Sequence, residues 1–491
     1  MNKETKLFNS LSKQKETFYS NKKGHISMYV CGPTVYDLLH IGNFRGPIFF
    51  NILRNWFEHL GYKVKYVYNY TDIDDKIINK AKSENLDIKT ISEKYISEFE
   101  KDYASLKIPK PTHNPKCTEH MDDIIDFISD LIEKKFAYFN NGSVFFSLKK
   151  FKNYGKLSGK KIEDLLAGHR VQVNDNKKDA LDFVLWKPSE KSEPGWESPW
   201  GYGRPGWHIE CSAMASKLLG SQIDIHGGGV DLLFPHHENE IAQSECRYNS
   251  NFSNFWVHNN LINFDNQKMS KSLGNIIKAR DFIKDYNPEI LKFLILGVHY
   301  RSILNFNESQ INNTIINLLK IYSSLMLAES ILYKEKEEII VLDFKNYIES
   351  CDLEIYQFLN NDFNTPGVFS IIFNLVRKFN LLAVNKKSNS ELAYISNLFI
   401  SLIKKYGNIL GLFNESVSKY LYELNLLLLK NRKVSVSKLN KLIDKRNNAR
   451  KEKDYLLSDK IRDEILELGI EIKDTQDGLT QWSVKVDFKK S

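Results

Sequence analysis

The chain has 491 residues, a formal net charge of +8 and 42% hydrophobic residues, which predicts two to four domains with sizeable cores. Its five cysteines are too few and too scattered for a disulfide scaffold. Residues 1–24 are polar and lysine-rich, unlike a secretion signal, and no apolar run approaches the ~20 residues that span a bilayer. We therefore expect a cytoplasmic protein without membrane association, whose positive charge is compatible with a nucleic-acid partner. No dimerisation signal stands out, so a monomer is the default expectation.

The N-terminal region has the pattern of a parallel α/β sheet. Residues 26–30 and 62–70 are predicted strands, and the apolar stretch 48–60 between them has helical spacing. Strand, turn, helix and strand in this order are typical of such a sheet, and its ligands bind at the carboxyl ends of the strands. The residues that follow the two strands are Cys31, Thr34, Thr71 and Asp72.

The rest of the chain divides into an insertion, a return of the sheet and a helical region. Short strands and Gly- and Lys-rich turns between 126 and 200 indicate an insertion, and the α/β pattern returns at 223–229. After about 305, helical periodicity predicts a bundle, followed by a unit with one or two basic helices. The expected parts are 1–125 and 201–305 for the two halves of the sheet domain, 126–200 for the insertion, 306–432 for the bundle, and 433–491 for the C-terminal unit.

Four residues could bind one zinc ion per chain, namely Cys31, Cys211, His236 and Glu240. His236 and Glu240 are four residues apart, so a helix would place both on one face. Zinc accepts this mixed set of sulfur, nitrogen and oxygen donors. His237 is three residues before Glu240, so spacing alone leaves it as an alternative to His236. Each cysteine alone could instead be a small buried hydrophobic residue.

The sequence HIGN at 40–43 follows the first predicted strand and its turn. His40 and Asn43 offer side-chain donors near a helix N-terminus, where anions are favoured. Gly42 allows a nucleotide to approach the backbone closely. These four residues by themselves are also compatible with a surface histidine near the start of a helix.

A second motif, KMSKS, occupies residues 268–272. Lys268 and Lys271 can both reach a polyphosphate, and their charges would stabilise a departing pyrophosphate in the transition state. A lone pair of lysines at this spacing is a weak signal, but HIGN and KMSKS in one chain are specific.

Together the motifs resemble those of class I aminoacyl-tRNA synthetases, and more narrowly the chain resembles the cysteinyl-tRNA synthetase family. The resemblance covers nearly the whole chain and runs through 29–43, 70–76, 154–159, 182–187, 203–212, 226–244, the KMSKS loop, 299–302, 362–366 and the terminal unit. Asn43 stands where the general class I motif has a histidine, and Asn260 replaces a usual glycine, for which we expect only a small backbone adjustment. The resemblance implies a Rossmann-type parallel sheet with an inserted connective domain, an α-helical bundle and a small anticodon-binding unit.

The same resemblance implies that L-cysteine is activated by ATP with Mg²⁺ to cysteinyl-adenylate and transferred to the 3′ end of tRNA(Cys). It selects His236 rather than His237 as the zinc ligand. Apolar contacts would separate cysteine from serine by only ~1–3 kcal/mol, whereas zinc lowers the pKa of the substrate thiol and binds it as a thiolate. Selection by bond chemistry would make an editing domain unnecessary. Either the substrate sulfur becomes a fifth ligand or Glu240 is released.

The resemblance also implies individual roles for other residues. The implied catalytic residues are His40, Asn43, Lys268 and Lys271. The implied ATP-binding residues are Thr34, His40, Gly42, Asn43, His226, Lys268 and Lys271. The implied cysteine-binding residues are Gly32, Thr71, Trp207 and Asp231. The implied anticodon residues are Arg446, Arg450, Arg462, Asp474 and Trp482, where unpaired bases could stack on the aromatic ring.

Two other functions are compatible with parts of the sequence. A cysteine ligase that acts on a small amine would need the same catalytic motifs, but the basic terminal unit argues against it. A non-catalytic zinc-containing RNA-binding protein would not need intact HIGN and KMSKS motifs.

Overall fold

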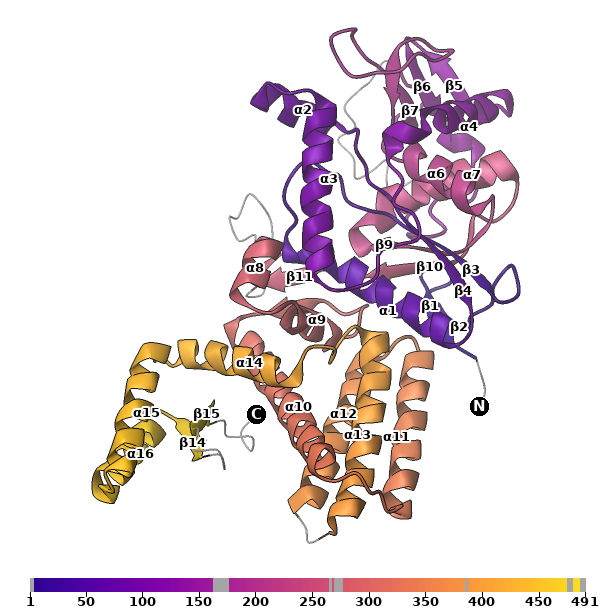
Figure 1. Cartoon of the computed structure of the whole chain (residues 1–491). Helices are drawn as coiled ribbons and strands as arrows, with labels where there is room; N and C mark the ends of the chain where they lie inside the picture. The colour runs from indigo at the N-terminus through magenta and orange to yellow at the C-terminus, as the bar shows by residue number, and fades with distance from the viewer. Residues whose placement is uncertain are drawn as a thin grey trace. The chain divides into compact units, whose positions relative to one another are not determined.

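The computed structural model describes residues 4–161, 176–264, 267–268, 277–384, 387–474 and 480–485. The chain forms two compact units (Figure 1). The first, which we call the sheet unit, comprises Met1–Asp285, Val298–Asn305 and Tyr356–Pro366. The second, the helical unit, comprises Tyr286–Gly297, Phe306–Ile355 and Gly367–Ser491.

The centre of the sheet unit is a four-stranded parallel sheet with the order β10-β9-β3-β4. Its strands are β3 (His25–Val30), β4 (Lys63–Tyr68), β9 (Ile223–Gly229) and β10 (Ser253–Asn259). The predicted parallel sheet is thus confirmed. Because parallel strands place their carboxyl ends at one edge, residues that follow β3, β4 and β9 meet there although they are distant in sequence.

The insertion between β4 and β9 contains an antiparallel sheet with the order β5-β6-β7-β8. Its strands are β5 (Ala137–Asn140), β6 (Ser143–Phe146), β7 (Phe183–Pro188) and β8 (Gly203–Pro205). It shares one hydrophobic core with the parallel sheet, because Phe146 and Leu185 belong to the same buried cluster as Tyr29 and Ile223. The insertion is therefore packed as part of the sheet unit.

The other elements of the sheet unit connect and cover these sheets. Its α-helices are α1 (Arg45–His59), α2 (Asp75–Glu84), α3 (Ile88–Ser105), α4 (Met121–Glu133), α6 (Ile209–Leu219), α7 (Glu238–Tyr248) and α8 (Ala279–Asp285). Its remaining strands are β1 (Lys6–Asn9), β2 (Gln14–Thr17), β11 (Ile262–Phe264), β12 (Gln267–Lys268) and β13 (Leu304–Phe306). Short helical turns occur at η1 (Ile41–Phe44), η2 (Cys117–His120), η3 (Leu148–Lys150), η4 (Val230–Leu232) and η5 (Leu233–His237).

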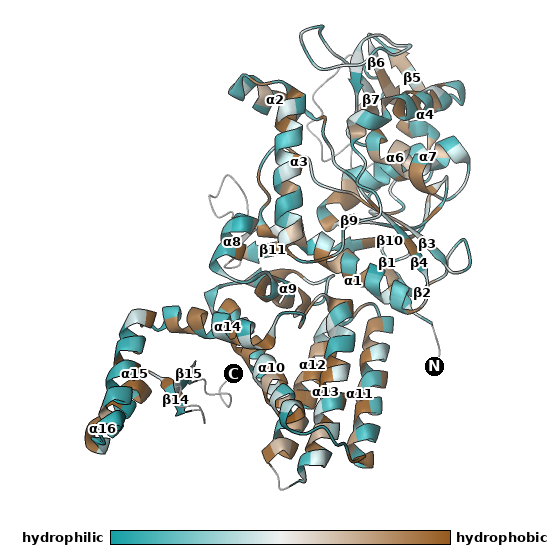
Figure 2. Cartoon of the chain, viewed as in Figure 1, coloured by the Kyte–Doolittle hydropathy of each residue, from teal (hydrophilic) through white to brown (hydrophobic). Residues whose placement is uncertain are grey.

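The helical unit contains the bundle of helices that the sequence predicts after about residue 305. They are α10 (Glu308–Lys334), α11 (Leu342–Asn360), α12 (Thr365–Val384), α13 (Asn389–Leu410) and α14 (Val417–Asn431), preceded by α9 (Pro288–Leu296). Both hydrophobic and hydrophilic residues occur along each of these helices (Figure 2). Helix α13 begins at a capping box between Ser388 and Glu391 and ends at Gly411 in the left-handed conformation.

Helices α10 and α12 each contain an 18-residue stretch that is long and apolar enough to cross a membrane by composition. The sequence analysis above expects no apolar run of this length. Of these stretches, 44% in α10 and 39% in α12 is buried, and the buried part packs within the bundle. Helix α10 buries Ile315 and Leu318, and Phe379 of α12 stacks on Phe399 of α13 with ring centroids 4.3 Å apart. The core helices of a bundle meet the same criterion of length and composition.

The sequence predicts one or two basic helices in the C-terminal unit, and the structure has two, α15 (Val436–Lys451) and α16 (Tyr455–Glu467). It also contains a hairpin that the sequence reading missed, formed by β14 (Ile470–Asp474) and β15 (Thr480–Val484). Most side chains in these two strands are at least partly exposed, so their sequence lacks the strong apolar alternation by which a half-buried strand is predicted.

The helical unit has a buried carboxyl group, Glu289 on α9. Its Oε1 atom accepts hydrogen bonds from the Tyr322 hydroxyl at 2.8 Å and from the Phe413 backbone N–H at 3.0 Å. Burial raises the pKa of Glu289 to about 7, although these bonds and Lys292 act in the opposite direction; Glu415 raises it further. The folded unit therefore retains a proton that the unfolded chain releases at a lower pH.

We expect the free energy of unfolding of the helical unit to fall as pH rises from about 4.5 towards 7. The reason is that a raised pKa of Glu289 stabilises the folded state below the unfolded pKa of 4.5, and this contribution is lost as the pH passes the folded value. The Glu289→Gln variant keeps the Oε1 acceptor but cannot titrate. Urea unfolding at pH 5 and pH 8 should show a smaller pH dependence in this variant, and an identical dependence in both proteins would contradict the prediction.

Candidate active site and metal centre

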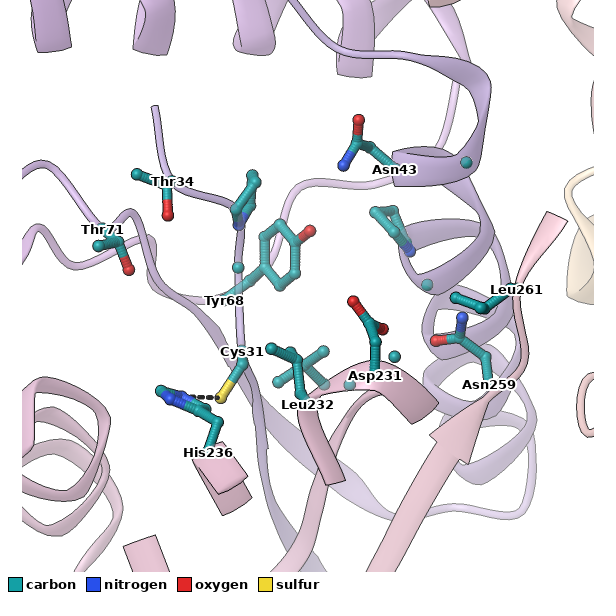
Figure 3. A pocket seen from close by; sticks show the side chains of 18 of the residues that line it. Cys31, Thr34, Asn43, Tyr68, Thr71, Asp231, Leu232, His236, Asn259 and Leu261 are labelled. Carbon is teal, nitrogen blue, oxygen red and sulfur yellow. Dashed lines mark hydrogen bonds between the residues drawn. The ribbon is translucent and has the colours of Figure 1, made fainter. Parts of the chain in front are cut away.

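A cavity of about 390 Å³ opens at the carboxyl ends of the parallel strands (Figure 3). The structure brings most of the predicted site residues together around it. Those that line the cavity are Cys31, Gly32, Thr34, His40, Gly42, Asn43, Thr71, Trp207, Cys211, Asp231 and His236. These residues come from both halves of the sheet unit, so the cavity exists only because the fold joins segments distant in sequence.

The HIGN residues form the turn that leads into α1. The His40 ring accepts a hydrogen bond through Nδ1 from the Gly42 backbone N–H at 3.1 Å, and Asn43 Oδ1 accepts one from the His40 backbone N–H at 3.0 Å. Because Nδ1 is an acceptor, a neutral His40 ring carries its hydrogen on Nε2. The asparagine at position 43 thus caps this turn at the edge of the cavity, where the helix N-terminus favours an anion.

The KMSKS segment lies largely outside the described residues. Lys271 is not described, and Lys268 is described only by its backbone, at the end of β12. One side of the loop follows β12, which pairs with β11, and Ile262 of β11 lines the cavity. On the other side, the Ile41 N–H donates to the Ile277 carbonyl at 3.1 Å, next to His40. Both sides of the loop are therefore anchored beside the HIGN turn and the cavity.

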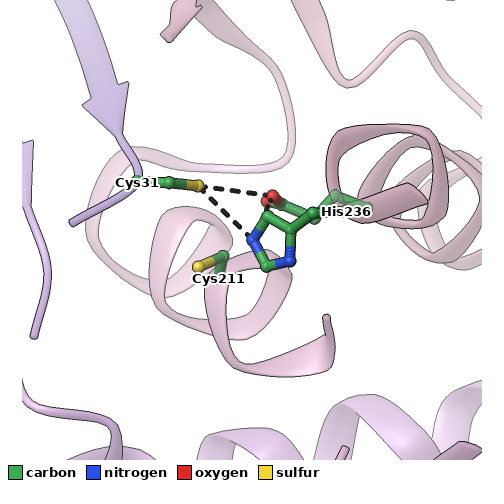
Figure 4. Close-up of side chains that lie close together, drawn as sticks. Cys31, Cys211 and His236 are labelled. Atoms are coloured by element: carbon green, nitrogen blue, oxygen red, sulfur yellow. Dashed lines mark hydrogen bonds and ion pairs between the residues drawn. The ribbon is translucent and has the colours of Figure 1, made fainter. Parts of the chain in front are cut away.

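The four predicted metal ligands converge at one end of the cavity (Figure 4). The thiol of Cys31 lies 3.4 Å from Glu240 Oε1 and 3.6 Å from His236 Nε2, and His236 Nε2 lies 3.1 Å from Glu240 Oε1. The ligand atoms of these three residues and Cys211 all lie within 4.8 Å of one another, and all four residues are buried. Zinc bonds of ~2.0–2.3 Å to such donors require separations of this size, so the residues fit a zinc ion.

Local structure explains this convergence. Cys31 directly follows β3, and Cys211 lies in the first turn of α6. His236 lies in the π-helical turn η5, which continues into α7, so that Glu240 faces the same side one turn later. The extended conformation of Phe234 (φ −141°, ψ 132°) changes the chain direction within this turn.

The electrostatics of the cluster favour a bound cation. Burial alone would lower the pKa of His236, but Glu240 and Cys211 raise it to about 10. A hydrogen bond from Cys31 lowers the pKa of Cys211 to about 6, assisted by His236 and opposed by burial. Burial acts to raise the pKa of Glu240, but its interactions with His226 and His236 hold this pKa well below its usual range. Burial and the neighbouring Cys211 and Glu240 raise the pKa of the Cys31 thiol, so the anionic donors of the cluster are Cys211 and Glu240. In this buried place they need a positive partner.

Two further histidines hold the predicted ligands in orientation. His226 donates through Nε2 to Glu240 Oε2 at 2.9 Å, and His208 hydrogen-bonds His236 through the two Nδ1 atoms at 3.0 Å. Such bonds fix the direction of metal ligands. His226 was expected at the ATP site, but it is fully buried, stacks on Trp256 at 4.3 Å and is outside the cavity lining. Its position on β9 directs it to Glu240 instead.

His237, the alternative ligand left open by the spacing, lies beside the cluster. Its Nδ1 atom hydrogen-bonds His258 Nε2 at 2.8 Å, and its Nε2 atom is 4.0 Å from Glu240 Oε1. With Cys31 and His226 it forms a second group of nearby donor atoms, but this group has three members. The group with four members contains His236.

Of the residues expected around the substrate cysteine, Trp207 and Gly32 lie beside the predicted ligands, and Thr71 and Asp231 line the same cavity. Trp207 is 41% exposed, and its ring centroid lies 4.5 Å from that of His236. Gly32 has no room for a side chain, because a Cβ atom there would lie 1.7 Å from the Asn69 carbonyl oxygen. The cavity lining also includes Lys76, to which the sequence analysis assigned no role although it ends one of the matched segments.

Asn260 stands where the family usually has glycine, and hydrogen bonds accommodate its side chain. Its side-chain amide donates to the Arg301 carbonyl at 2.8 Å, and its Oδ1 atom accepts from the Leu261 N–H at 2.8 Å. Asn260 is not among the residues with a positive φ. The backbone here therefore does not require the glycine that is usual in the family.

In the C-terminal unit, three of the predicted anticodon residues lie together. Asp474 accepts two hydrogen bonds from Arg446, at 2.9 and 2.8 Å, and also pairs with Arg450. The bonds from Arg446 hold the pKa of Asp474 well below its usual range. Arg446 is buried, whereas Arg462 is exposed on α16. Trp482 is partly exposed, and its ring centroid lies 6.0 Å from that of Tyr422.

Comparison with known proteins identifies the family. Residues 17–316 match the model of the tRNA synthetases class I (C) catalytic domain, and residues 354–414 match the DALR domain. The chain is 47% identical over 480 residues to the cysteine–tRNA ligase of Bdellovibrio bacteriovorus, covering 98% of this chain and 99% of that protein.

Solved structures show the same fold at low sequence identity. Two structures of Mycobacterium tuberculosis methionyl-tRNA synthetase with methionyl-adenylate match with TM-scores of 0.62 and 0.63 at 12% and 11% identity. Each match covers 81% of this chain and 93% of the methionyl-tRNA synthetase chain. The match to the catalytic-domain model and the 47% identity to the Bdellovibrio protein show that the chain belongs to the cysteine–tRNA ligase family of class I tRNA synthetases.

Proposed function

We propose that the chain activates L-cysteine with ATP and Mg²⁺ and transfers the cysteinyl group to the 3′ end of tRNA(Cys). The observation that carries this proposal is that the HIGN turn and the Cys31–Cys211–His236–Glu240 cluster adjoin one cavity. The nucleotide motif supplies a place for ATP, and the cluster supplies a selector for a thiol. We also infer a monomer in the cytoplasm, without membrane association.

The phosphates of ATP would bind at the start of α1. His40 and Asn43 lie at this helix N-terminus, which favours anions. The lysines of the KMSKS segment would stabilise the charge that grows on the departing pyrophosphate. The residues that we assign to ATP are Thr34, His40, Gly42, Asn43, Lys268 and Lys271. His226 is left out, because its hydrogen bond goes to Glu240.

A zinc ion would be held by Cys31, Cys211, His236 and Glu240. When bound, it would lower the pKa of the substrate thiol and favour a thiolate over the hydroxyl of serine. Trp207 would cover the side chain of the substrate, and Asp231 would accept its ammonium group. Gly32 and Thr71 would complete the contact surface at the end of β3 and β4.

The chemistry itself requires mainly positioning by the protein. The cysteine carboxylate attacks the α-phosphorus of ATP, and pyrophosphate leaves. The terminal ribose hydroxyl of tRNA then attacks the acyl carbon, and AMP leaves. No side chain needs to form a covalent intermediate, so orientation and charge stabilisation account for the rate.

Charging of total tRNA with labelled cysteine tests this proposal. We expect cysteine to be esterified to tRNA in an ATP-dependent manner. A ligase that uses a small amine would consume ATP with cysteine but leave tRNA uncharged, and a non-catalytic RNA-binding protein would show neither reaction. The likeness to the Bdellovibrio protein extends over 98% of this chain, including the terminal unit, and supports the first outcome.

We further propose that the C-terminal unit reads the anticodon through Arg462, Trp482 and the group formed by Arg446, Arg450 and Asp474. The buried Arg446 would fix Asp474 in position, and the partly exposed Trp482 ring would be available for a base. Base stacking on an aromatic side chain contributes ~1–3 kcal/mol.

The Trp482→Ala variant should therefore raise the KM for tRNA roughly tenfold or more, since ~1.4 kcal/mol corresponds to a factor of ten. Cysteine-dependent pyrophosphate exchange, which needs no tRNA, should be unchanged. Tyr333→Ala is a suitable control, because Tyr333 is 84% exposed at the end of α10. Equal KM values for wild type and Trp482→Ala would refute the role of this ring.

A further inference from the structure

Arg45 is a buried cation that forms no ion pair with any described residue. It is the first residue of α1, two positions after the HIGN sequence, and it is 1% exposed. Burial lowers the pKa of Arg45 to about 10, so its guanidinium group stays charged at neutral pH. A helix dipole disfavours a cation at the N-terminus, and a buried charge without a partner is costly. The presence of arginine here is therefore not explained by the stability of α1.

Three backbone carbonyl groups surround the charge of Arg45. Its Nη1 atom donates to the Leu261 carbonyl, and its Nη2 atom donates to the carbonyls of Ser302 and, at 3.3 Å, His299. These acceptors lie 216 to 257 residues after Arg45 and belong to two separate segments. The donors of a guanidinium group have fixed directions in one plane. A single side chain thus holds both segments in a defined position against the start of α1.

The two segments lead into neighbouring strands of the small sheet β12-β11-β13. Leu261 directly precedes β11, and Ser302 lies two residues before β13. The Leu304 N–H donates to the same Leu261 carbonyl at 3.1 Å, so Arg45 binds where these two strands are joined. Strand β11 also pairs with β12, which leads into the KMSKS segment. Arg45 therefore connects the helix after HIGN with the sheet from which the KMSKS segment continues.

Aromatic packing shields these hydrogen bonds from solvent. Phe49 lies one helical turn after Arg45, is buried, and stacks on Tyr300 with ring centroids 4.0 Å apart and an interplanar angle of 11°. Tyr300 stands between His299 and Ser302 in the sequence, so the stacked rings adjoin the carbonyls that Arg45 binds. Hydrogen bonds in such a dry environment are stronger than in water.

Arg45 does not reach the cavity. Leu261 and Asn43 both line it (Figure 3), whereas Arg45 is absent from its lining. The side chain can therefore act on a reaction in the cavity only through the segments that it holds. A lysine at this position would have one nitrogen on a flexible stem, which cannot bind two segments in fixed directions.

We propose that Arg45 is a positioning residue for the activation of cysteine; this rests on the proposed function. Arg45 holds the sheet β12-β11-β13, and with it the strand that leads into the KMSKS segment, in register with the HIGN turn. The donors of the two motifs then act on the same phosphates. The metal ligands lie after β3 and on α6, η5 and α7, so loss of Arg45 changes kcat and not the affinity for cysteine.

Arg45→Lys and Arg45→Gln test this role in cysteine-dependent pyrophosphate exchange. The lysine variant keeps the charge but loses the planar fork, and the glutamine variant avoids a buried ammonium group. Arg54→Lys is the matched control, because Arg54 lies on the same helix outside the cavity lining and also donates to a backbone carbonyl, that of Lys110 at 2.7 Å. The kcat, the KM for cysteine and the zinc content are measured for each protein.

We expect kcat to fall about 10²-fold in both variants of Arg45, which is the effect of displacing reacting groups by ~1 Å. The KM for cysteine and the zinc content should remain those of the wild type, and Arg54→Lys should equal the wild type in all three measurements. A kcat in the Arg45 variants equal to that of Arg54→Lys would overturn the proposal. Loss of zinc together with exchange in both variants would overturn it as well, because Arg45 would then stabilise the sheet unit as a whole.

A double-mutant cycle with Lys271→Ala separates positioning from general destabilisation. If Arg45 acts through the KMSKS segment, less remains to be positioned once Lys271 is absent. Arg45→Lys should then lower kcat by at most about tenfold in the Lys271→Ala background, because the effects of coupled residues are not additive. Equal fold losses with and without Lys271 would overturn the proposal. Failure of the proposed function is seen separately, as absence of cysteine-dependent exchange in the wild type.

Discussion

Replacement of Cys211 by serine is expected to remove the bound zinc and most of the preference for cysteine over serine. Of the two cysteine ligands, Cys211 is the one whose pKa is lowered, to about 6, so it can provide a thiolate at neutral pH. A serine hydroxyl of similar size cannot. The remaining donors, Cys31, His236 and Glu240, would hold a metal more weakly. Without zinc, discrimination should fall to the roughly 10–200-fold that apolar contacts provide.

The measurements for Cys211→Ser are the zinc content per chain and the rates of pyrophosphate exchange with cysteine and with serine. Cys246→Ser is a matched control, because Cys246 is also buried in the sheet unit but is not in either group of possible ligands. His236→Ala should behave as Cys211→Ser does. Full zinc content in both ligand variants would show that the assigned ligand set is wrong.

Replacement of Lys271 by alanine is expected to lower cysteine-dependent pyrophosphate exchange by about 10²–10³-fold, the size of effect seen when one preorganised donor to transition-state charge is removed. Lys271 itself lies outside the described residues. The strand and the residue that flank its loop support the assignment. Strand β12 precedes the loop, and Ile277 after the loop accepts a hydrogen bond from Ile41 of the HIGN turn.

The zinc content of Lys271→Ala should equal that of the wild type, because the lysine is not a ligand. Lys284→Ala, an exposed lysine on α8, provides a control with the same loss of charge. If Lys271→Ala exchanged pyrophosphate at the wild-type rate, the assignment of Lys271 to the leaving group would be refuted.

Much of the fold follows from patterns that are local in sequence. The buried strand 26–30, the helix after HIGN and the bundle helices could be predicted because apolar periodicity reflects burial on one face. The hairpin β14–β15 could not, because its strands are short and mostly exposed. The shared core of the insertion and the parallel sheet depends on long-range packing, because one buried cluster contains both Phe146 and Tyr29, and no local pattern encodes this.

The candidate site, too, could be predicted only in part from the sequence. The spacing of His236 and Glu240 and the two ATP motifs are local, so their side chains could be selected from the sequence. The contacts of a side chain on a central strand depend on distant parts of the chain. His226 lies in the predicted strand 223–229, but the sequence does not show that it hydrogen-bonds Glu240. Likewise, the burial of Arg446 against Asp474 depends on the hairpin that the sequence reading missed.

The most direct test is the ratio of kcat/KM for cysteine to that for serine in pyrophosphate exchange, measured on wild-type protein with one zinc ion per chain. We predict a ratio of at least about 10⁴, since binding of a thiolate adds to the roughly 10–200-fold selectivity of an apolar pocket. A ratio within the range of about 10–200 would contradict the claim that the buried cluster of Cys31, Cys211, His236 and Glu240 selects the amino acid.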